Sequence, residues 1–350
     1  MRLASSLALA YLLVIAYASL QPFSGWWIPP EEIRRFLTAP WPRYITIEDV
    51  MVNIAAYLPL GFLFARSFMK HARDRRGVLM AALLTFVVSV GMESAQMFMP
   101  TRIASNVDVL TNSIGGLIGA LAAPLFSPTQ LLGSRLTRVR REWFAYGVRA
   151  DVGLVLLCLW IATQLHPTMQ LFGTGNLRST FDLPVWLIHR PPLLLTAEAA
   201  IAAFNVLGVG LIVLALTRDT KPRGLALAVL LAAALIAKGF CAIAIVKSPG
   251  PLTWFTPGVA VGLLAGGIAL YILASARPRT QWIAAALCLA AAIAATNIGP
   301  DNPYQAVPAH FLAGPRHFLS FSSIIRALSE LWPFLAVLYA GIAALDQRAT

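Results

Sequence analysis

Apolar residues fall along this chain in long runs, separated by shorter polar segments that carry most of the charges. Each run has about 15 to 23 residues, close to the length that an α-helix needs to cross the hydrocarbon core of a bilayer. The pattern predicts an all-α, polytopic integral membrane protein with about ten transmembrane helices. The predicted spans are 3–20, 50–68, 77–98, 107–125, 151–165, 194–216, 224–246, 257–274, 281–297 and 331–346.

Composition supports this interpretation. Hydrophobic residues make up 58% of the chain and charged residues 12%, whereas soluble domains are about 25% charged. All three cysteines, Cys158, Cys241 and Cys288, lie inside predicted helices. A disulfide framework is therefore not expected, and the cysteines are interpreted as small apolar residues that fill space in the helices.

The net charge of +12 is explained by topology rather than by nucleic-acid binding. One set of alternate segments contains seventeen Lys and Arg residues, and the opposite set contains nine. Because positive charge marks the cytoplasmic side, both termini are predicted to be cytoplasmic, in a multi-pass protein of the inner (cytoplasmic) membrane. The first span resembles a signal peptide around Ala16-Tyr17-Ala18, but the charge alternation favours its retention. The expected partners include membrane lipids and no nucleic acid.

Polar residues gather where the second, third and fourth spans approach the outer side. Asp49, Asn53 and Tyr57 share one helix face, and Glu93 and Gln96 share another. Polar and ionisable groups near lipid are costly and usually functional, which makes this cluster the candidate site. We expect one pocket, open to the outer side, with Glu93 and Arg102 paired directly or through water. The predicted ligand-binding residues are Asp49, Asn53, Tyr57, Glu93, Gln96, Arg102, Asp108 and Asn112.

A structural explanation of the same residues stays open. Thr46-x-x-Asp49 and Ser105-x-x-Asp108 both fit a hydroxyl helix cap followed by an acid in the first turn. The cluster contains no histidine or cysteine, so no metal and no cofactor are expected. Gly115 and Gly119 form a GxxxG pattern, which predicts that the fourth span packs inside the helix bundle.

The segment 126–150 is the only plausible boundary between domains. It is predicted to be a basic cytoplasmic loop between a four-helix membrane domain, 1–125, and a six-helix membrane domain of unknown role, 151–350. The intramembrane polar groups of the second half are scattered, and Lys238 is the most costly of them. Either a carboxylate partner or snorkelling to the interface would explain Lys238.

Three motifs together resemble the VanZ-like family. They are Asp49-x-x-x-Asn53-x-x-x-Tyr57-x-Pro59-x-Gly61, Glu93-x-x-Gln96-x-Phe98-x-Pro100-x-Arg102 and Asp108-x-x-x-Asn112-x-x-Gly115, and the likeness covers about residues 5 to 125. The family includes a protein that raises resistance to the glycopeptide antibiotic teicoplanin, and relatives occur beside envelope-polysaccharide genes. The position three after the arginine is often acidic in the family but is Ser105 here, which weakens a metal site.

Three functions remain as hypotheses. The first is a cell-envelope protein that binds or assists in handling an envelope lipid, glycan or glycopeptide at the outer membrane face. The second is a membrane enzyme acting on a lipid-linked phosphate or glycan, with the carboxylates as acid, base or ligands. The third is a purely structural membrane scaffold.

Overall fold

The computed structural model describes residues 2–20, 25–28, 35–42, 45, 47–71, 74–100, 102–166, 171–172, 174–178, 191–245, 250–300 and 318–346. Within these residues the fold is helical throughout, with a single isolated β-bridge between Phe144 and Thr217. The longer helices are α1 (Arg2–Leu20), α3 (Ile47–Phe68), α4 (Arg75–Gln96), α5 (Asn106–Ala122), α6 (Leu131–Trp143), α7 (Val148–Thr163), α9 (Pro191–Leu216), α10 (Arg223–Phe240), α11 (Pro257–Leu273), α12 (Pro278–Ile298) and α14 (Phe318–Asp346). A short helix, α2 (Arg35–Thr38), follows α1, and a π-helical turn, η2 (Cys241–Ile245), ends α10.

Each of the ten predicted spans lies on one of these helices. Seven helices among the described residues are long and apolar enough to cross a membrane, and the chain is therefore a multi-pass membrane protein. The number of ten crossings and the side of the termini stay predictions. One element differs from expectation: the segment predicted as a basic loop contains α6, because its few apolar residues recur at helical spacing among the arginines.

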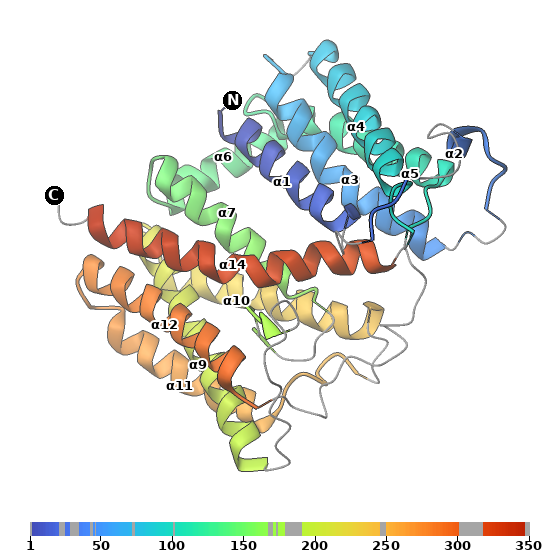
Figure 1. The fold of residues 1–350 in the computed structure, drawn as a ribbon. Helices are drawn as coiled ribbons and strands as arrows, with labels where there is room; N and C mark the ends of the chain where they lie inside the picture. The colour runs from blue at the N-terminus through green and yellow to red at the C-terminus, as the bar shows by residue number, and fades with distance from the viewer. Residues whose placement is uncertain are drawn as a thin grey trace. The chain divides into compact units, whose positions relative to one another are not determined.

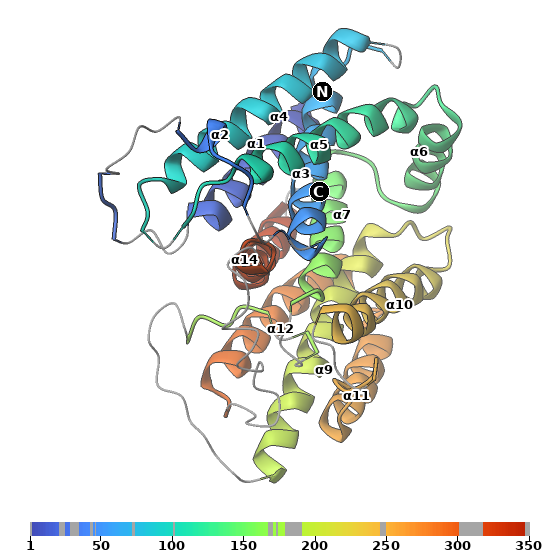
Figure 2. The ribbon, with the colours of Figure 1, turned by 90° about the vertical axis from the view of Figure 1, so that its right-hand side faces the viewer.

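The chain divides into two compact units, each described by itself. The first unit comprises Met1–Val139 and Gly314–Ala327. In it α3, α4 and α5 run side by side, with α1 packed on α3 (Figures 1 and 2). The Tyr11 hydroxyl of α1 donates to the Ala56 carbonyl of α3 at 2.9 Å, and Ile15 and Ala18 are almost fully buried. The first helix is thus part of the core of this unit.

Glycines let α5 approach its neighbours closely. A methyl group added at Gly115 or Gly119 would overlap backbone carbonyl oxygens of α3, and one added at Gly61 of α3 would overlap Gly116 of α5. On the adjoining face, Gly116 lies against the side chain of Thr85 in α4. The predicted packing of the GxxxG helix inside the bundle is therefore confirmed.

The second unit comprises Arg140–Ala313 and Leu328–Thr350, and α9 lies at its centre against α11 and α12 (Figure 1). The same small-residue packing recurs, because Gly262 and Gly266 of α11 lie against the backbone of α9. The largest buried side chains are Trp160 and Trp332, and the Trp332 indole donates to the Leu156 carbonyl at 2.7 Å. Buried polar side chains of this unit include Arg178, Glu198 and Lys238.

Lys238 is 3% exposed near the end of α10. Its ammonium group donates to the His166 carbonyl at 3.1 Å, just beyond the last turn of α7. Cys241, the first residue of the π-helical turn, donates to the Leu165 carbonyl at 3.2 Å. The buried Lys238 ammonium group is therefore bound by a backbone carbonyl at the end of another helix, as expected for the negative end of a helix dipole.

Cysteine labelling tests the predicted topology. Single cysteines placed at Ser24, Ser179 and Ser320 should react with an impermeant maleimide added to intact cells, whereas one placed at Ser134 in α6 should not. Ser24 and Ser179 lie outside the described residues. Reaction at Ser134 in intact cells, with Ser320 protected, would reverse the orientation of the whole chain.

Candidate functional site

A hydrogen-bonded network of polar side chains connects α3, α4 and α5. The Asn53 amide donates to the Asp108 carboxylate at 3.0 Å, so the two similar Asp-Val-x-x-Asn helix starts are joined directly. One turn deeper, the Asn112 amide donates to the Ser89 hydroxyl at 3.0 Å, and the side chain of Tyr57 lies beside Ser89. Asn112 and Tyr57 are each 4% exposed. The network therefore pairs the amide donors of Asn53 and Asn112, which hydrocarbon would leave unpaired, while the buried Asn112 Oδ1 atom has no partner among the described residues.

Glu93 lies at the top of this network and is 3% exposed. Its carboxylate accepts a hydrogen bond from the backbone amide of Ser105 at 2.9 Å. The Ser105 hydroxyl in turn accepts from the amides of Val107 and Asp108 and caps α5. The predicted cap at Ser105 is confirmed, and Thr46, the other predicted cap, lies outside the described residues. Glu93 thus fixes the loop from which α5 begins.

Gln96 and Arg102 bind the carboxyl end of α1. The Gln96 amide donates to the Ser19 carbonyl and the Arg102 guanidinium to the Ala18 carbonyl, both at 3.2 Å. Burial lowers the pKa of Arg102, and the negative charge of Glu93 raises it. The two charges are therefore near neighbours, and the arginine also holds carbonyl groups that the end of a helix leaves unpaired.

Asp49 is 9% exposed and lies in the first turns of α3. A carboxylate there offsets the positive end of the helix dipole. Among the described residues, no group of three His, Cys, Asp or Glu side chains is placed to hold a metal ion. The structure thus brings Asn53 into contact with Asp108 and Asn112 into contact with Ser89. It also places the side chains of Gln96 and Arg102 against the carboxyl end of α1.

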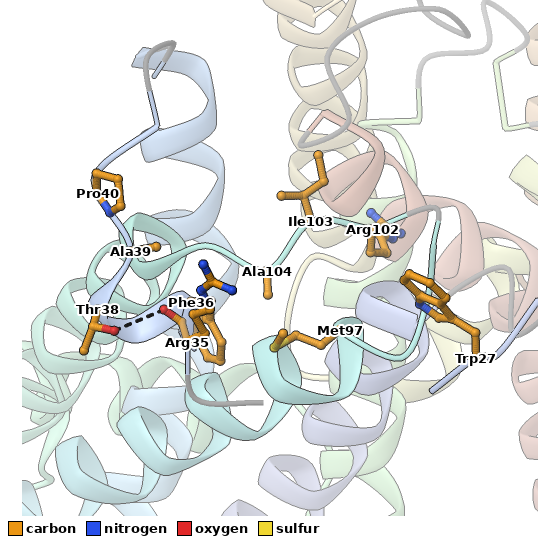
Figure 3. A pocket seen from close by; sticks show the side chains of 10 residues that line it. All are labelled: Trp27, Arg35, Phe36, Thr38, Ala39, Pro40, Met97, Arg102, Ile103 and Ala104. Atoms are coloured by element: carbon orange, nitrogen blue, oxygen red, sulfur yellow. Dashed lines mark hydrogen bonds between the residues drawn. The ribbon is translucent and has the colours of Figure 1, made fainter. Parts of the chain in front are cut away.

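The first unit contains a cavity of about 640 Å³, and Arg102 is part of its lining (Figure 3). Short helix α2 forms one wall, and the loop between α4 and α5 forms another. Hydrogen bonds pin these walls: the Trp27 amide donates to the Phe98 carbonyl at 3.0 Å, and the Asn106 side chain to the Ala39 carbonyl at 2.7 Å. The lining residues are Trp27, Arg35, Phe36, Thr38, Ala39, Pro40, Met97, Arg102, Ile103 and Ala104.

Both charged residues of this lining are arginines, Arg35 from α2 and Arg102 from the loop. Of the eight residues predicted for the site, Arg102 is the one that lines the cavity. Because its charge also interacts with that of Glu93, Arg102 connects the cavity to the polar network. Sequence reasoning missed Trp27, Arg35, Phe36 and Met97. The available signal in the sequence is the tryptophan, which is followed within ten residues by an arginine and a phenylalanine.

Comparison with known proteins identifies the region that contains this site. The model of the VanZ/LLP1 family matches residues 6–127, which include α1, α3, α4, α5, the polar network and the cavity. Residues 6–127 are VanZ-like. No curated protein and no solved structure matches the chain.

The VanZ-like region ends close to the residue predicted from the motifs. Its motif residues are the ones that join helices in the structure: Asn53 to Asp108, Glu93 to the start of α5, and Arg102 to the end of α1. Ser105, which departs from the acidic residue common in the family, caps α5 here and presents its amide to Glu93.

Proposed function

We propose that the VanZ-like region binds an anionic, partly apolar ligand of the cell envelope at the outer face of the inner membrane. The ligand class is an envelope lipid, a lipid-linked glycan or a glycopeptide. The observation that carries the proposal is the cavity with two arginines and an aromatic lining above a buried polar network. In this view the protein assists in handling the ligand, with effects on polysaccharide output or on antibiotic resistance of the teicoplanin type.

The chemistry of the lining favours this ligand class. Guanidinium groups bind phosphate and carboxylate oxygens with two parallel hydrogen bonds, which a lysine does not reproduce. Phe36 is 6% exposed and Trp27 47%, so one wall is packed and the other presents an aromatic ring to a ligand. A mostly apolar pocket with a few polar groups is the usual form of a small-molecule site. An anionic headgroup with an apolar or sugar portion fits both features.

Replacement of Arg102 by lysine tests the proposal. Arg102→Lys keeps the charge but loses the planar fork, and we expect the protein to accumulate normally while its function falls about tenfold or more. The readout is the envelope phenotype of a deletion strain, measured as glycopeptide sensitivity and polysaccharide output at matched protein level. Arg35→Lys should act in the same way, and Arg75→Lys, an exposed arginine at the start of α4, is the matched control. Full complementation by the Arg35→Lys, Arg102→Lys double variant would count against a ligand site.

A structural scaffold is the second candidate, and the contacts of Gln96 and Arg102 with α1 favour it. A scaffold role predicts that apolar replacement of both charges is tolerated, because buried charge pairs are often replaceable as a unit. The double variant Glu93→Leu, Arg102→Met would then restore both accumulation and complementation. Restored accumulation without complementation would support the ligand site.

A further inference from the structure

Helix α6 carries an exposed apolar stripe. At 100° per residue, Leu132, Leu136, Val139 and Trp143 lie within an arc of about 60° on the helix circumference. Leu132, Leu136 and Val139 are 43%, 48% and 49% exposed. Three exposed, neighbouring apolar side chains on a highly charged helix require an apolar environment.

Contacts with the rest of the chain use the side of α6 next to this stripe. Near its start, Gly133 is buried against the backbone of Phe126 and Ser127. Near its end, Arg140 forms an ion pair with Asp151 of α7 at 2.7 Å and donates to the Ala145 carbonyl at 2.8 Å. These anchors lie on one side of the helix, beside the stripe and not within it.

The connections of α6 confine it to the membrane boundary. Four residues, 127–130, separate it from the 3₁₀ turn that continues α5, and another four, 144–147, separate it from α7. Four residues reach at most about 14 Å. The apolar α5 is long enough to cross the bilayer together with that turn. Helix α7 contains the span 151–165 that is predicted from the sequence. Both ends of α6 therefore stay within a short distance of lipid.

We propose that α6 lies along the cytoplasmic surface of the membrane, with its apolar stripe among the acyl chains and Arg135 at the level of anionic headgroups. Arg135 lies about 40° from the edge of the stripe, where its long side chain reaches the interface. Arg141 points to the opposite side of the helix, toward water. An amphipathic helix with arginines beside a leucine-rich face has the composition of a lipid-surface anchor. This site is separate from the outer-face ligand site.

Depth measurements on the full chain in lipid nanodiscs test the placement. Spin labels are attached at Leu136→Cys and Val139→Cys, or at Ser134→Cys and Arg138→Cys, in a chain carrying Cys158→Ala, Cys241→Ser and Cys288→Ala. The first two labels should be relaxed mainly by oxygen, which concentrates in lipid, and the other two mainly by a water-soluble nickel chelate. A label at position 136 that is relaxed only by the nickel chelate would show that this face of α6 lies in water. Labels at Leu136 shielded from both reagents would show that a protein covers the stripe, and either result overturns the proposal.

Lipid selectivity tests the role of Arg135. A fluorophore at Val139→Cys should transfer energy more strongly to a labelled phosphatidylglycerol than to a labelled phosphatidylcholine in mixed nanodiscs. Arg135→Gln should lower the preference for the anionic lipid about fivefold, the equivalent of about 1 kcal/mol per arginine at an anionic surface. Arg141→Gln on the opposite side is the matched control and should change it less than twofold. Equal effects of the two variants, or no preference in the parent chain, would contradict a headgroup contact by Arg135.

Discussion

Replacement of Glu93 by alanine is expected to remove most of the folded protein from the membrane. The Glu93 carboxylate is 3% exposed, accepts the Ser105 amide at the start of α5 and lies close to the Arg102 charge. Alanine would leave a buried amide without its acceptor and would remove the negative charge that interacts with the half-buried Arg102 guanidinium. Removing one member of a buried charge pair costs about 3–5 kcal/mol. We expect the apparent melting temperature in detergent to fall by on the order of 10 °C.

Two further variants make this result specific. Glu93→Gln keeps an acceptor oxygen for Ser105 and removes only the charge, so its loss of stability should be intermediate. Glu142→Ala removes a carboxylate from the surface of α6, where it pairs with Lys221 at 3.7 Å, and should cost less than about 1 kcal/mol. Fluorescence-detected size exclusion of a tagged chain measures all three. A Glu93→Ala variant that melts with the parent chain would show that Glu93 has no part in holding α5.

The spans were predictable because hydrocarbon imposes one rule on the whole chain. A helix that crosses a bilayer needs a long apolar run, and each predicted run lies on a helix. The rule gives no information about helices that do not cross the bilayer, and the segment that contains α6 was therefore interpreted as a loop. Its Leu132, Leu136 and Val139 are too few to raise the hydropathy of the segment, although their spacing is helical.

The partners of Lys238, Arg178 and Arg102 were the least predictable feature, because each of these cations binds a backbone carbonyl distant in the sequence. A carboxylate or the interface was expected for Lys238, and its ammonium group binds the His166 carbonyl. Arg178 is 5% exposed and binds the Asn297 carbonyl at the end of α12, as Arg102 binds Ala18 at the end of α1. In each case a buried or half-buried cation meets the negative end of a helix.

The cavity could not be predicted for a related reason. Its walls meet through contacts between segments far apart in the chain, such as Trp27 with Phe98 and Asn106 with Ala39. The spacing of Asn53 and Tyr57 along α3, and of Asp108 and Asn112 along α5, predicts which face of each helix carries polar groups. Spacing along single helices does not reveal which loops fold over the helix ends.

Gly119→Ala and Gly61→Ala should each disrupt the VanZ-like bundle. A methyl group at Gly119 would overlap the Leu58 carbonyl oxygen, and one at Gly61 would overlap the backbone of Gly116. Both obstacles are helix backbone, which cannot change rotamer, so α3 and α5 must separate along their length. Overpacking of this kind costs about 1–3 kcal/mol, and sometimes more. In a membrane the loss is not recovered by a hydrophobic driving force, because lipid tails are as apolar as the core.

Gly91→Ala is the matched control for these variants. Gly91 lies in α4 of the same unit, is exposed, and has no neighbouring atom within 4 Å of an added methyl group. Alanine has a higher helix propensity than glycine, so this variant should be neutral or slightly stabilising. Thermal unfolding of the three variants, measured at equal expression, separates the effect of the steric overlap from the effect of helix propensity. If Gly119→Ala, Gly61→Ala and Gly91→Ala all unfolded at the temperature of the parent chain, close contact between α3 and α5 would not be what holds the VanZ-like region together.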